Sequence, residues 1–217
     1  MEKNGETAGK KLNIVQKNVG EIKMKEISII LPNQLHEKNQ FLKKEFPIYL
    51  IEEYLFFKQF NFHKQKLMFH RSSMKHYENY LIKIGYNVRY IESKDKSSEI
   101  KNFIRNLSKE IETIHTIDPD DYLIEKRLKK ECQKRSIKII FYDNPSFINT
   151  KEDLKTFFKN EKVKFFQTSF YKNQRKKLNI LIDNNDPAGG KWTYDNENRE
   201  KYPKNKKTPI ILYPKTD

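Results

Sequence analysis

Two sets of polar side chains in this sequence are spaced so that they could bind a ligand. The first set follows short apolar runs: a Pro-Asn-Gln turn at residues 32–34, a glutamate pair after the next run, and a histidine and lysine that open an amphipathic stretch. Amide, carboxylate and imidazole groups that meet in one crevice can bind a polar heterocycle through its hydrogen-bonding edge. The candidate binding residues are Asn33, Gln34, Glu52, Glu53, His63 and Lys64. The alternative is that the carboxylates at the strand ends only face water.

The same region offers little for metal or phosphate chemistry. His63 and His70 are seven residues apart, whereas zinc-binding histidines on a helix are usually three to five apart, so we expect no metal site. Cys132 is the only cysteine, which excludes an internal disulfide and a four-cysteine cluster within this chain. The turn at residues 32–34 has no glycine, so it cannot form a dinucleotide or phosphate-binding loop. We therefore expect no catalytic residues.

The second set of polar residues is basic and lies near the C-terminus. The run KNQRKK at residues 172–177 follows four aromatic residues within one predicted helix, and the chain carries a net charge of +15. Basic residues interleaved with aromatic ones can bind nucleic acid through phosphate contacts and base stacking. The alternative is a helix that buries its aromatic stripe and leaves its lysines in water. The charge excess itself is also compatible with a role in solubility alone.

The segment AGGKWTYDNENR, residues 188–199, joins two of the chain's six glycines to its single tryptophan. Adjacent glycines indicate a tight turn with positive φ, and an indole beside the turn can anchor it. Together with the basic run, this segment supplies the candidate residues for contact with nucleic acid or another domain. They are Lys172, Arg175, Lys176, Lys177, Gly189, Gly190, Trp192, Asp195, Asn198 and Arg199.

The elements that position these residues alternate between strands and helices. Five β-branched runs predict strands, and amphipathic stretches separate most of them; the strands are at residues 26–31, 47–53, 87–92, 113–117 and 137–142. This alternation predicts an α/β fold with a Rossmann-like, parallel five-stranded sheet and helices on both faces. Ligands of such sheets bind outside the carboxyl ends of the strands, near the point where the strand order reverses.

The best-defined helix follows the second strand. We expect Asn61 to cap it and Gly85 to end it in a left-handed conformation. Its apolar stripe, which faces the sheet, consists of Leu67, Met74, Tyr77, Leu81 and Ile84. Further helices are predicted at residues 97–112, 120–135, 151–160 and 165–178.

Four stretches of the chain together resemble one known family. They are IILPNQL (residues 29–35), the long segment FHKQKLMFHRSSMKHYENYLIKIGYNVRYIE (62–92), FYKNQRKKLNILI (170–182) and AGGKWTYDNENR (188–199). They are similar to the "GDQL", "SAMRH", "FYREMRRKTG" and "GGRWNFDAENR" segments of the deoxyribodipyrimidine photolyase-related proteins. This is the bacterial photolyase and cryptochrome branch that carries an iron–sulfur cluster. The resemblance covers residues 26–203 and concerns the N-terminal α/β domain of these proteins.

The resemblance implies a function in light-dependent DNA repair or signalling. It implies a site for an antenna chromophore of the ribityllumazine type, near Asn33, Gln34, Glu52, His63 and Lys64. Two departures bear on this site: Pro32-Asn33 stands where the family has Gly-Asp, and Phe56 stands near a second acidic position of such pockets. The segment around Gly189-Gly190 would leave the α/β domain toward a helical flavin domain.

The resemblance also predicts how the chain is divided. We expect a loosely held N-terminal extension at residues 1–23, an antenna-type domain at 24–182, and an exit segment at 183–217. FAD and an iron–sulfur cluster would belong to a helical domain that this chain lacks and that a separate chain could supply, so the chain alone would not be catalytic. No apolar run is long enough to span a membrane and no signal peptide is evident, so we expect a cytoplasmic protein. The alternative function is that of a stand-alone, basic nucleic-acid-binding protein.

Overall fold

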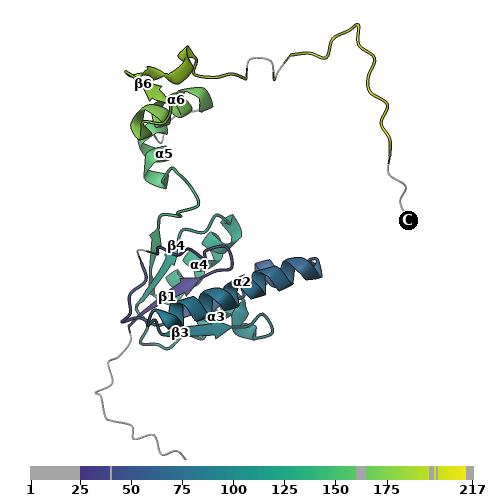
Figure 1. Ribbon diagram of the computed structural model, residues 1–217. Helices are drawn as coiled ribbons and strands as arrows, with labels where there is room; N and C mark the ends of the chain where they lie inside the picture. The colour runs from purple at the N-terminus through teal and green to yellow at the C-terminus, as the bar shows by residue number, and fades with distance from the viewer. Residues whose placement is uncertain (1–24, 40, 160–164, 196–197, 199, 214–217) are drawn as a thin grey trace, which may run out of the picture. The chain divides into compact units, whose positions relative to one another are not determined.

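The computed structural model describes residues 25–39, 41–159, 165–195, 198 and 200–213 (Figure 1). The chain forms two compact units, of which the first ends at Lys151 and the second begins at Glu152. The predicted N-terminal extension at residues 1–23 lies outside the described residues, as does Arg199. The predicted boundary between residues 182 and 183 stays a prediction.

The first unit is built on a five-stranded sheet in which all neighbouring strands are parallel. Its strands are β1 (Glu26–Ile30), β2 (Ile48–Ile51), β3 (Val88–Ile91), β4 (Thr113–Ile117) and β5 (Lys138–Tyr142). Their order, β3-β2-β1-β4-β5, confirms the predicted Rossmann-like fold and reverses direction between β1 and β4. The carboxyl ends of β1 and β4 therefore flank the position where such sheets bind ligands.

Helices cover both faces of this sheet. On one face, Ile27, Ile29 and Ile114 pack against α3 (Ile100–Arg105) and α4 (Tyr122–Lys134). On the other face, Ile30 and Leu50 pack against α2 (Lys64–Lys83) and against the loop that follows β1. The alternating strand pattern thus divides the buried residues into two cores, because neighbouring side chains of a strand point to opposite faces. The short helix α1 (Tyr54–Phe57) and the 3₁₀ turn η1 (Lys96–Ser98) complete the unit.

The long helix α2 follows its predicted pattern in the middle but not at its ends. Met74, Tyr77 and Leu81 are buried against the sheet, as predicted, and Gly85 ends the helix with a φ of +91°. The predicted cap at Asn61 is wrong, because the Nδ1 atom of His63 accepts the Gln65 N–H at 3.2 Å and so caps the helix. Two residues of the predicted stripe are less buried than expected: Leu67 is half-buried and Ile84 is exposed.

Two other helix predictions differ in length from the structure. The helix expected at residues 97–112 is much shorter, since η1 precedes α3 and Asn106 ends it after Arg105. The Asp95 side chain accepts the Ser97 N–H and starts the separate 3₁₀ turn, which interrupts the helical pattern. The helix expected at residues 120–135 is α4, and the Asp121 carboxylate caps it by accepting the backbone N–H groups of Leu123 and Ile124.

The second unit contains two helices and a small hairpin. Helix α5 (Lys151–Phe158) and helix α6 (Gln167–Leu178) match the predictions to within two residues at each end. The strands β6 (Ile182–Asp183) and β7 (Asp186–Pro187) form an antiparallel hairpin, followed by the 3₁₀ turn η2 (Ala188–Gly190). Asn184 and Asn185, both with positive φ, make the two-residue turn of the hairpin, which asparagine tolerates better than most residues.

Aromatic side chains hold α5 and α6 together. The ring centroids of Phe157 and Phe170 are 5.2 Å apart, and those of Phe158 and Phe165 are 5.1 Å apart. Such edge-on contacts stabilise aromatic pairs beyond the burial of their area. The aromatic residues before the basic run thus form a helix-helix contact, although Phe165 itself remains largely exposed.

Candidate functional site

The predicted site residues after β1 are engaged in holding the sheet together. Gln34 is buried; its Nε2 atom donates to the Ile117 carbonyl and its Oε1 atom accepts the Leu31 N–H, each at 3.0 Å. The amide therefore ties the loop after β1 to the end of β4. The Nδ2 atom of Asn33 donates to the carboxylate of Asp120. Both side chains lie at the predicted crevice, but the oxygen and the nitrogen of the Gln34 amide are both hydrogen-bonded to the backbone.

Glu52 is fully buried at the carboxyl end of β2 and accepts four hydrogen bonds. Two come from the Arg71 guanidinium, at 2.6 and 2.5 Å, one from the Tyr90 hydroxyl and one from the Ser93 N–H, both at 2.7 Å. Burial alone would raise the pKa of Glu52, but the donors, foremost Arg71, outweigh it and hold the pKa at about 2. Glu52 is thus a permanent anion whose acceptor positions are occupied.

Glu53 is also buried and ties two helices to the sheet. Its carboxylate accepts the Leu55 N–H at 2.5 Å, at the start of α1, and the Ile100 N–H at 3.3 Å, at the start of α3. The Arg127 guanidinium lies 3.9 Å away. Burial raises the pKa of Glu53 despite these donors. This carboxylate has a structural function as a helix cap.

His63 and Lys64 lie on the exposed start of α2. His63 caps the helix, whereas Lys64 is exposed. His70, which is too far along the helix to form a zinc pair with His63, lies near the ring of Phe57. Their ring centroids are 6.0 Å apart, and burial lowers the pKa of His70. None of the six predicted residues lines either of the two hollows described below.

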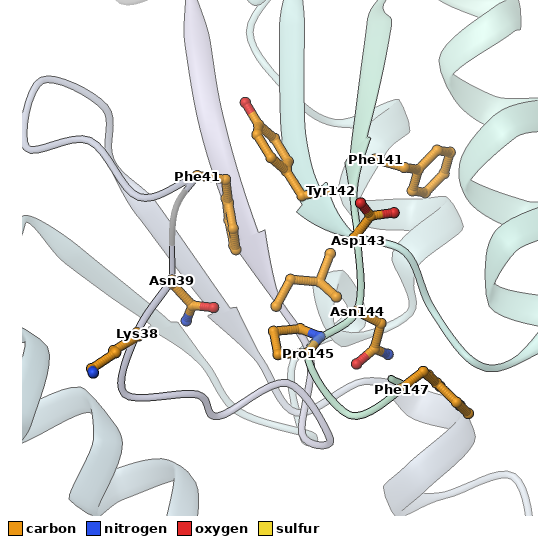
Figure 2. A pocket seen from close by; sticks show the side chains of 10 residues that line it. Lys38, Asn39, Phe41, Phe141, Tyr142, Asp143, Asn144, Pro145 and Phe147 are labelled. Carbon is orange, nitrogen blue, oxygen red and sulfur yellow. The ribbon is translucent and has the colours of Figure 1, made fainter. Parts of the chain in front are cut away.

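The first hollow has a volume of about 500 Å³ and lies at the carboxyl ends of β4 and β5 (Figure 2). One side is the loop after β1, with Asn39 and Phe41, and the other is the turn after β5, with Asp143 and Asn144. Ile117, the last residue of β4, also lines the hollow. The hollow therefore flanks the position where the strand order reverses, as the general rule for parallel sheets predicts.

Four aromatic and four polar side chains line this hollow. Phe41 and Tyr142 lie against each other with ring centroids 5.3 Å apart, and Phe141 and Phe147 also line the space. Small-molecule sites of several hundred Å³ are typically lined by apolar rings with a few polar groups that fix orientation. The size and lining suit a flat aromatic ligand.

A chain of hydrogen bonds holds the Tyr142 hydroxyl. The buried His115 of β4 lies between the Tyr142 hydroxyl, 2.9 Å from Nδ1, and the Glu26 carboxylate, 2.7 Å from Nε2. A carboxylate can only accept, so Nε2 carries the proton in the neutral imidazole and the Tyr142 hydroxyl donates to Nδ1. The ring of Tyr142 is thereby fixed at the edge of the hollow.

Sequence reasoning missed the lining of this hollow. A signal was available, because the turn after the fifth predicted strand reads Asp143-Asn144-Pro145 and must also lie at the carboxyl edge. Asn39 and Phe41 had no comparable signal, since they lie in a loop whose path depends on the tertiary fold.

Large apolar side chains are exposed on the segments that follow three of the strands. We call this set the apolar rim; it consists of Phe60, Met68, Phe69, Tyr122, Phe147 and Ile148, each more than half exposed. These segments are the connection after β2 with the first turns of α2, the start of α4, and the turn after β5. Since the connections after parallel strands begin at the carboxyl edge, the rim and the hollow share that edge.

The second unit gathers cations around its tryptophan. The cationic groups of Lys172, Arg175 and Lys176 lie 5.7, 5.3 and 5.3 Å from the Trp192 ring centroid. Arg175 is buried and donates to backbone carbonyls, among them that of Ile180 at 3.1 Å. A second hollow, of about 320 Å³, is lined here by Arg175, Trp192 and tyrosine rings. The predicted Lys177 lies apart from this cluster and pairs with Asp153 of α5.

The glycine pair forms the predicted turn. Gly189 and Gly190 have φ values of +77° and +75°, and the Tyr194 hydroxyl donates to the Gly189 carbonyl at 3.2 Å. Asn198 donates to Asp195 at 2.9 Å. The turn is therefore held by local contacts of its own segment.

The described residues contain neither a membrane-spanning helix nor a cluster of metal-binding side chains. None of the helices described combines the length and the apolar composition needed to cross a bilayer. Within the same ranges, no group of three or more histidine, cysteine or acidic side chains is placed to hold a metal ion.

Comparison with known proteins gives one family and two relatives. The family model described as deoxyribodipyrimidine photo-lyase-related protein matches residues 28–217. "Uncharacterized protein R852" of Acanthamoeba polyphaga mimivirus is 38% identical over 192 residues, which cover 83% of this chain and 96% of that protein. The "(6-4) photolyase" of Agrobacterium fabrum is 25% identical over 187 residues, which cover 82% of this chain but only 36% of that enzyme.

Proposed function

The chain belongs to the deoxyribodipyrimidine photo-lyase-related protein family, and from this we propose that it is the α/β module of a light-dependent DNA repair or signalling system. In this proposal the chain binds an antenna chromophore of the ribityllumazine type and docks onto a helical domain that binds FAD. An iron–sulfur cluster, where the system has one, also belongs to that helical partner. The chain on its own performs no catalysis.

The observation that carries the proposal is the aromatic hollow beside the strand reversal. Its volume of about 500 Å³ is within the range of small-molecule sites, and the rings of Tyr142 and Phe147, which are not buried, offer faces for a flat ligand. The bound chromophore would supply light absorption, and the protein would supply position and a dry environment. The predicted residues at the end of β2 would support this site indirectly, since Glu52 and Glu53 hold the neighbouring helices in place.

The apolar rim supports the docking part of the proposal. Large exposed apolar side chains that gather on one edge of a soluble domain indicate an interaction surface. The rim lies on the carboxyl edge that also holds the hollow, so a partner seated there would come close to a bound chromophore. Energy transfer through space needs that proximity and needs no acid or base chemistry from this chain.

A titration of the full-length protein with a ribityllumazine tests chromophore binding. We expect a shifted absorbance band and a rise in fluorescence anisotropy as the probe binds. Phe147→Ser removes one aromatic wall and should weaken binding about fivefold, from the usual energy of an aromatic contact. Ile148→Ser is the matched control, because Ile148 is exposed next to Phe147 but does not line the hollow. An unchanged spectrum, or equal effects of the two substitutions, would contradict the proposed site.

A second candidate function is nucleic-acid binding by the second unit. What favours it is the position of Lys172 and Lys176 beside the Trp192 ring, since cations beside aromatic rings suit both phosphates and bases. The relatives do not bear on this function of the chain alone. In the light-dependent system, the same cluster would contact DNA next to the helical partner.

Salt dependence tests this second function. The logarithm of the affinity for duplex DNA falls linearly with the logarithm of the salt concentration. If Lys172 and Lys176 each contact one phosphate, Lys172→Gln/Lys176→Gln should make this slope less steep by about 2. Lys201→Gln/Lys204→Gln is the control, because these exposed lysines lie outside the cluster. Equal slopes for the two double variants would exclude the cluster as a phosphate-binding site.

A further inference from the structure

The second hollow is lined by aromatic rings that solvent can reach. Tyr194 is 71% exposed, Tyr171 is 43% exposed and Trp192 is half-buried, and all three line the hollow. Leu181, which is 68% exposed, lines it as well. The volume of about 320 Å³ lies at the lower end of the range of small-molecule sites. The hollow therefore offers accessible ring faces to one flat group.

Two lysines beside this hollow are available to bind an anion. The Nζ atoms of Lys172 and Lys176 lie 5.7 and 5.3 Å from the Trp192 ring centroid. Within the part of the chain that the structure describes, neither lysine forms an ion pair, whereas the neighbouring Lys177 pairs with Asp153. Flat rings with free cations beside them complement a nucleotide, which joins a flat base to an anionic phosphate.

Arg175 positions the rings of the hollow. It is buried, and its guanidinium donates to the Tyr171 hydroxyl at 3.3 Å and to the Trp192 carbonyl at 3.4 Å. It also donates to the carbonyls of Ile180 and Leu181. These bonds occupy most of its N–H groups, so Arg175 holds the ring-bearing segments together and leaves phosphate binding to the lysines.

The acidic residue that lines the hollow is Asp195. Its side chain is exposed, and its Oδ2 atom accepts a hydrogen bond from Asn198 at 2.9 Å. A carboxylate repels a phosphate, but its oxygens can accept further hydrogen bonds from the N–H groups of a base. The carboxylate therefore favours a nucleotide whose base edge faces Asp195 and whose phosphates lie toward the lysines.

We propose that the second unit binds single-stranded DNA by taking one unpaired base into this hollow, while Lys172 and Lys176 contact the adjoining phosphates. This inference rests on the second candidate function and deepens it, because it names the base as a group that is bound and the single strand as the preferred form of DNA. In a duplex the bases are paired and stacked on one another, so a base must leave the stack before it can enter a pocket. A basic surface without a base site would bind the more highly charged duplex at least as well.

Two oligonucleotides that differ only in their bases test the inference. One is an oligothymidylate of about eight nucleotides, within the usual length of single-strand sites, and the other is an abasic oligomer of the same length and charge. In fluorescence anisotropy titrations of the full-length protein at low salt, we expect the abasic oligomer to bind about tenfold more weakly, the usual effect of losing one stacked base. Equal affinities would overturn the base site.

The single tryptophan gives a second readout, because Trp192 lines the hollow. A base that stacks on the rings of the hollow should quench the fluorescence of Trp192 as the oligothymidylate binds. Fluorescence that stays unchanged at saturation would place the bound strand elsewhere on the protein and would contradict the inference.

Two variants separate the ring from general effects on the unit. Trp192→Leu keeps an apolar side chain but removes the ring, so it should lose most of the preference for the oligothymidylate over the abasic oligomer. Phe166→Ser is the matched control, because Phe166 is an exposed ring of the same unit that does not line the hollow. A full preference in Trp192→Leu, or an equal loss in Phe166→Ser, would refute the inference.

The outcomes distinguish this inference from the function on which it rests. Equal binding of both oligomers refutes the base site and leaves phosphate binding by the lysines standing. Absence of binding by either oligomer to the folded wild-type protein overturns both. Tighter binding of a duplex of equal phosphate number, or of an oligouridylate of RNA, would contradict the assignment to single-stranded DNA. Should Trp192→Leu fail to fold, the comparison of the two oligomers on the wild-type protein still decides the question.

Discussion

Replacing Glu52 by glutamine should remove a large part of the stability of the first unit, and should do so in a manner that depends on pH. The Glu52 carboxylate is fully buried and accepts hydrogen bonds from Arg71, Tyr90 and Ser93. Glutamine has the same shape, but its amide nitrogen would point a donor at groups that are themselves donors. Glu52→Gln therefore loses the ion pair and leaves at least one donor facing another.

The size of the effect follows from the pKa of Glu52. The pKa falls from an ordinary value of 4.5 to about 2 in the folded protein, and each pH unit corresponds to about 1.4 kcal/mol, which gives about 3 kcal/mol near neutral pH. Because the folded-state pKa is the lower one, this stability is complete above about pH 4.5 and is lost as the pH falls toward 2. The difference between wild type and Glu52→Gln should therefore narrow by about 2 kcal/mol between about pH 6 and pH 3.

Urea unfolding followed by far-UV circular dichroism measures this difference, since the single tryptophan lies in the second unit. Glu78→Gln is the control on the same helix that carries Arg71. Glu78 pairs with Lys75 at 3.0 Å near the surface, and such pairs contribute about 0.5 kcal/mol or less. A loss of stability in Glu52→Gln that is the same at both pH values, or no larger than in Glu78→Gln, would refute the reasoning.

Three further predictions concern the turn, a cap and the rim. Gly189→Ala and Gly190→Ala should each destabilise the second unit by roughly 1 kcal/mol, because both residues have positive φ. At Gly189 the added Cβ would also lie 2.6 Å from the Tyr194 hydroxyl oxygen, but that side chain is exposed and can move aside. Tryptophan fluorescence during urea unfolding measures both losses, and an unchanged midpoint in either variant would contradict the prediction. Asp121→Ala should cost about 1 kcal/mol in urea unfolding through the loss of the α4 cap, and an unchanged midpoint would show that the cap is dispensable. Phe69→Ser in the apolar rim should leave stability within about 0.5 kcal/mol but weaken binding to the helical FAD-binding domain of a family member, as measured by calorimetry; Ile82→Ser, exposed near the other end of the same helix, should not weaken it.

Much of the fold could be predicted from local patterns. The five apolar runs became the five strands, and the middle of α2 buries Met74, Tyr77 and Leu81 as the helical spacing indicated. Helix ends were predicted less well, because caps depend on single side-chain contacts. The choice between Asn61 and His63 is one example, since both can accept an N–H and only the path of the preceding turn decides which one does.

The candidate site shows the limits of the same reasoning. The rule that ligands bind near the strand reversal points to the edge of the sheet where the first hollow lies, yet none of the six residues predicted for binding lines that hollow. Glu52 had the features of a binding carboxylate in the sequence. Its donors, Arg71 and Ser93, lie 19 and 41 residues further along the chain. The residues next to Glu52 in the sequence therefore could not show that its carboxylate oxygens are hydrogen-bonded within the protein.

The sequence by itself determined the class of fold, the parallel direction of the strands and the positive-φ turn at Gly189-Gly190, because these depend on residue types within a few positions of one another. Only the tertiary structure decided the strand order and the partners of the buried carboxylates. The physical reason is that a hydrogen bond forms between groups that are near in space. Whether a polar side chain forms hydrogen bonds within the protein or can bind a ligand therefore depends on neighbours that come together only when the chain folds.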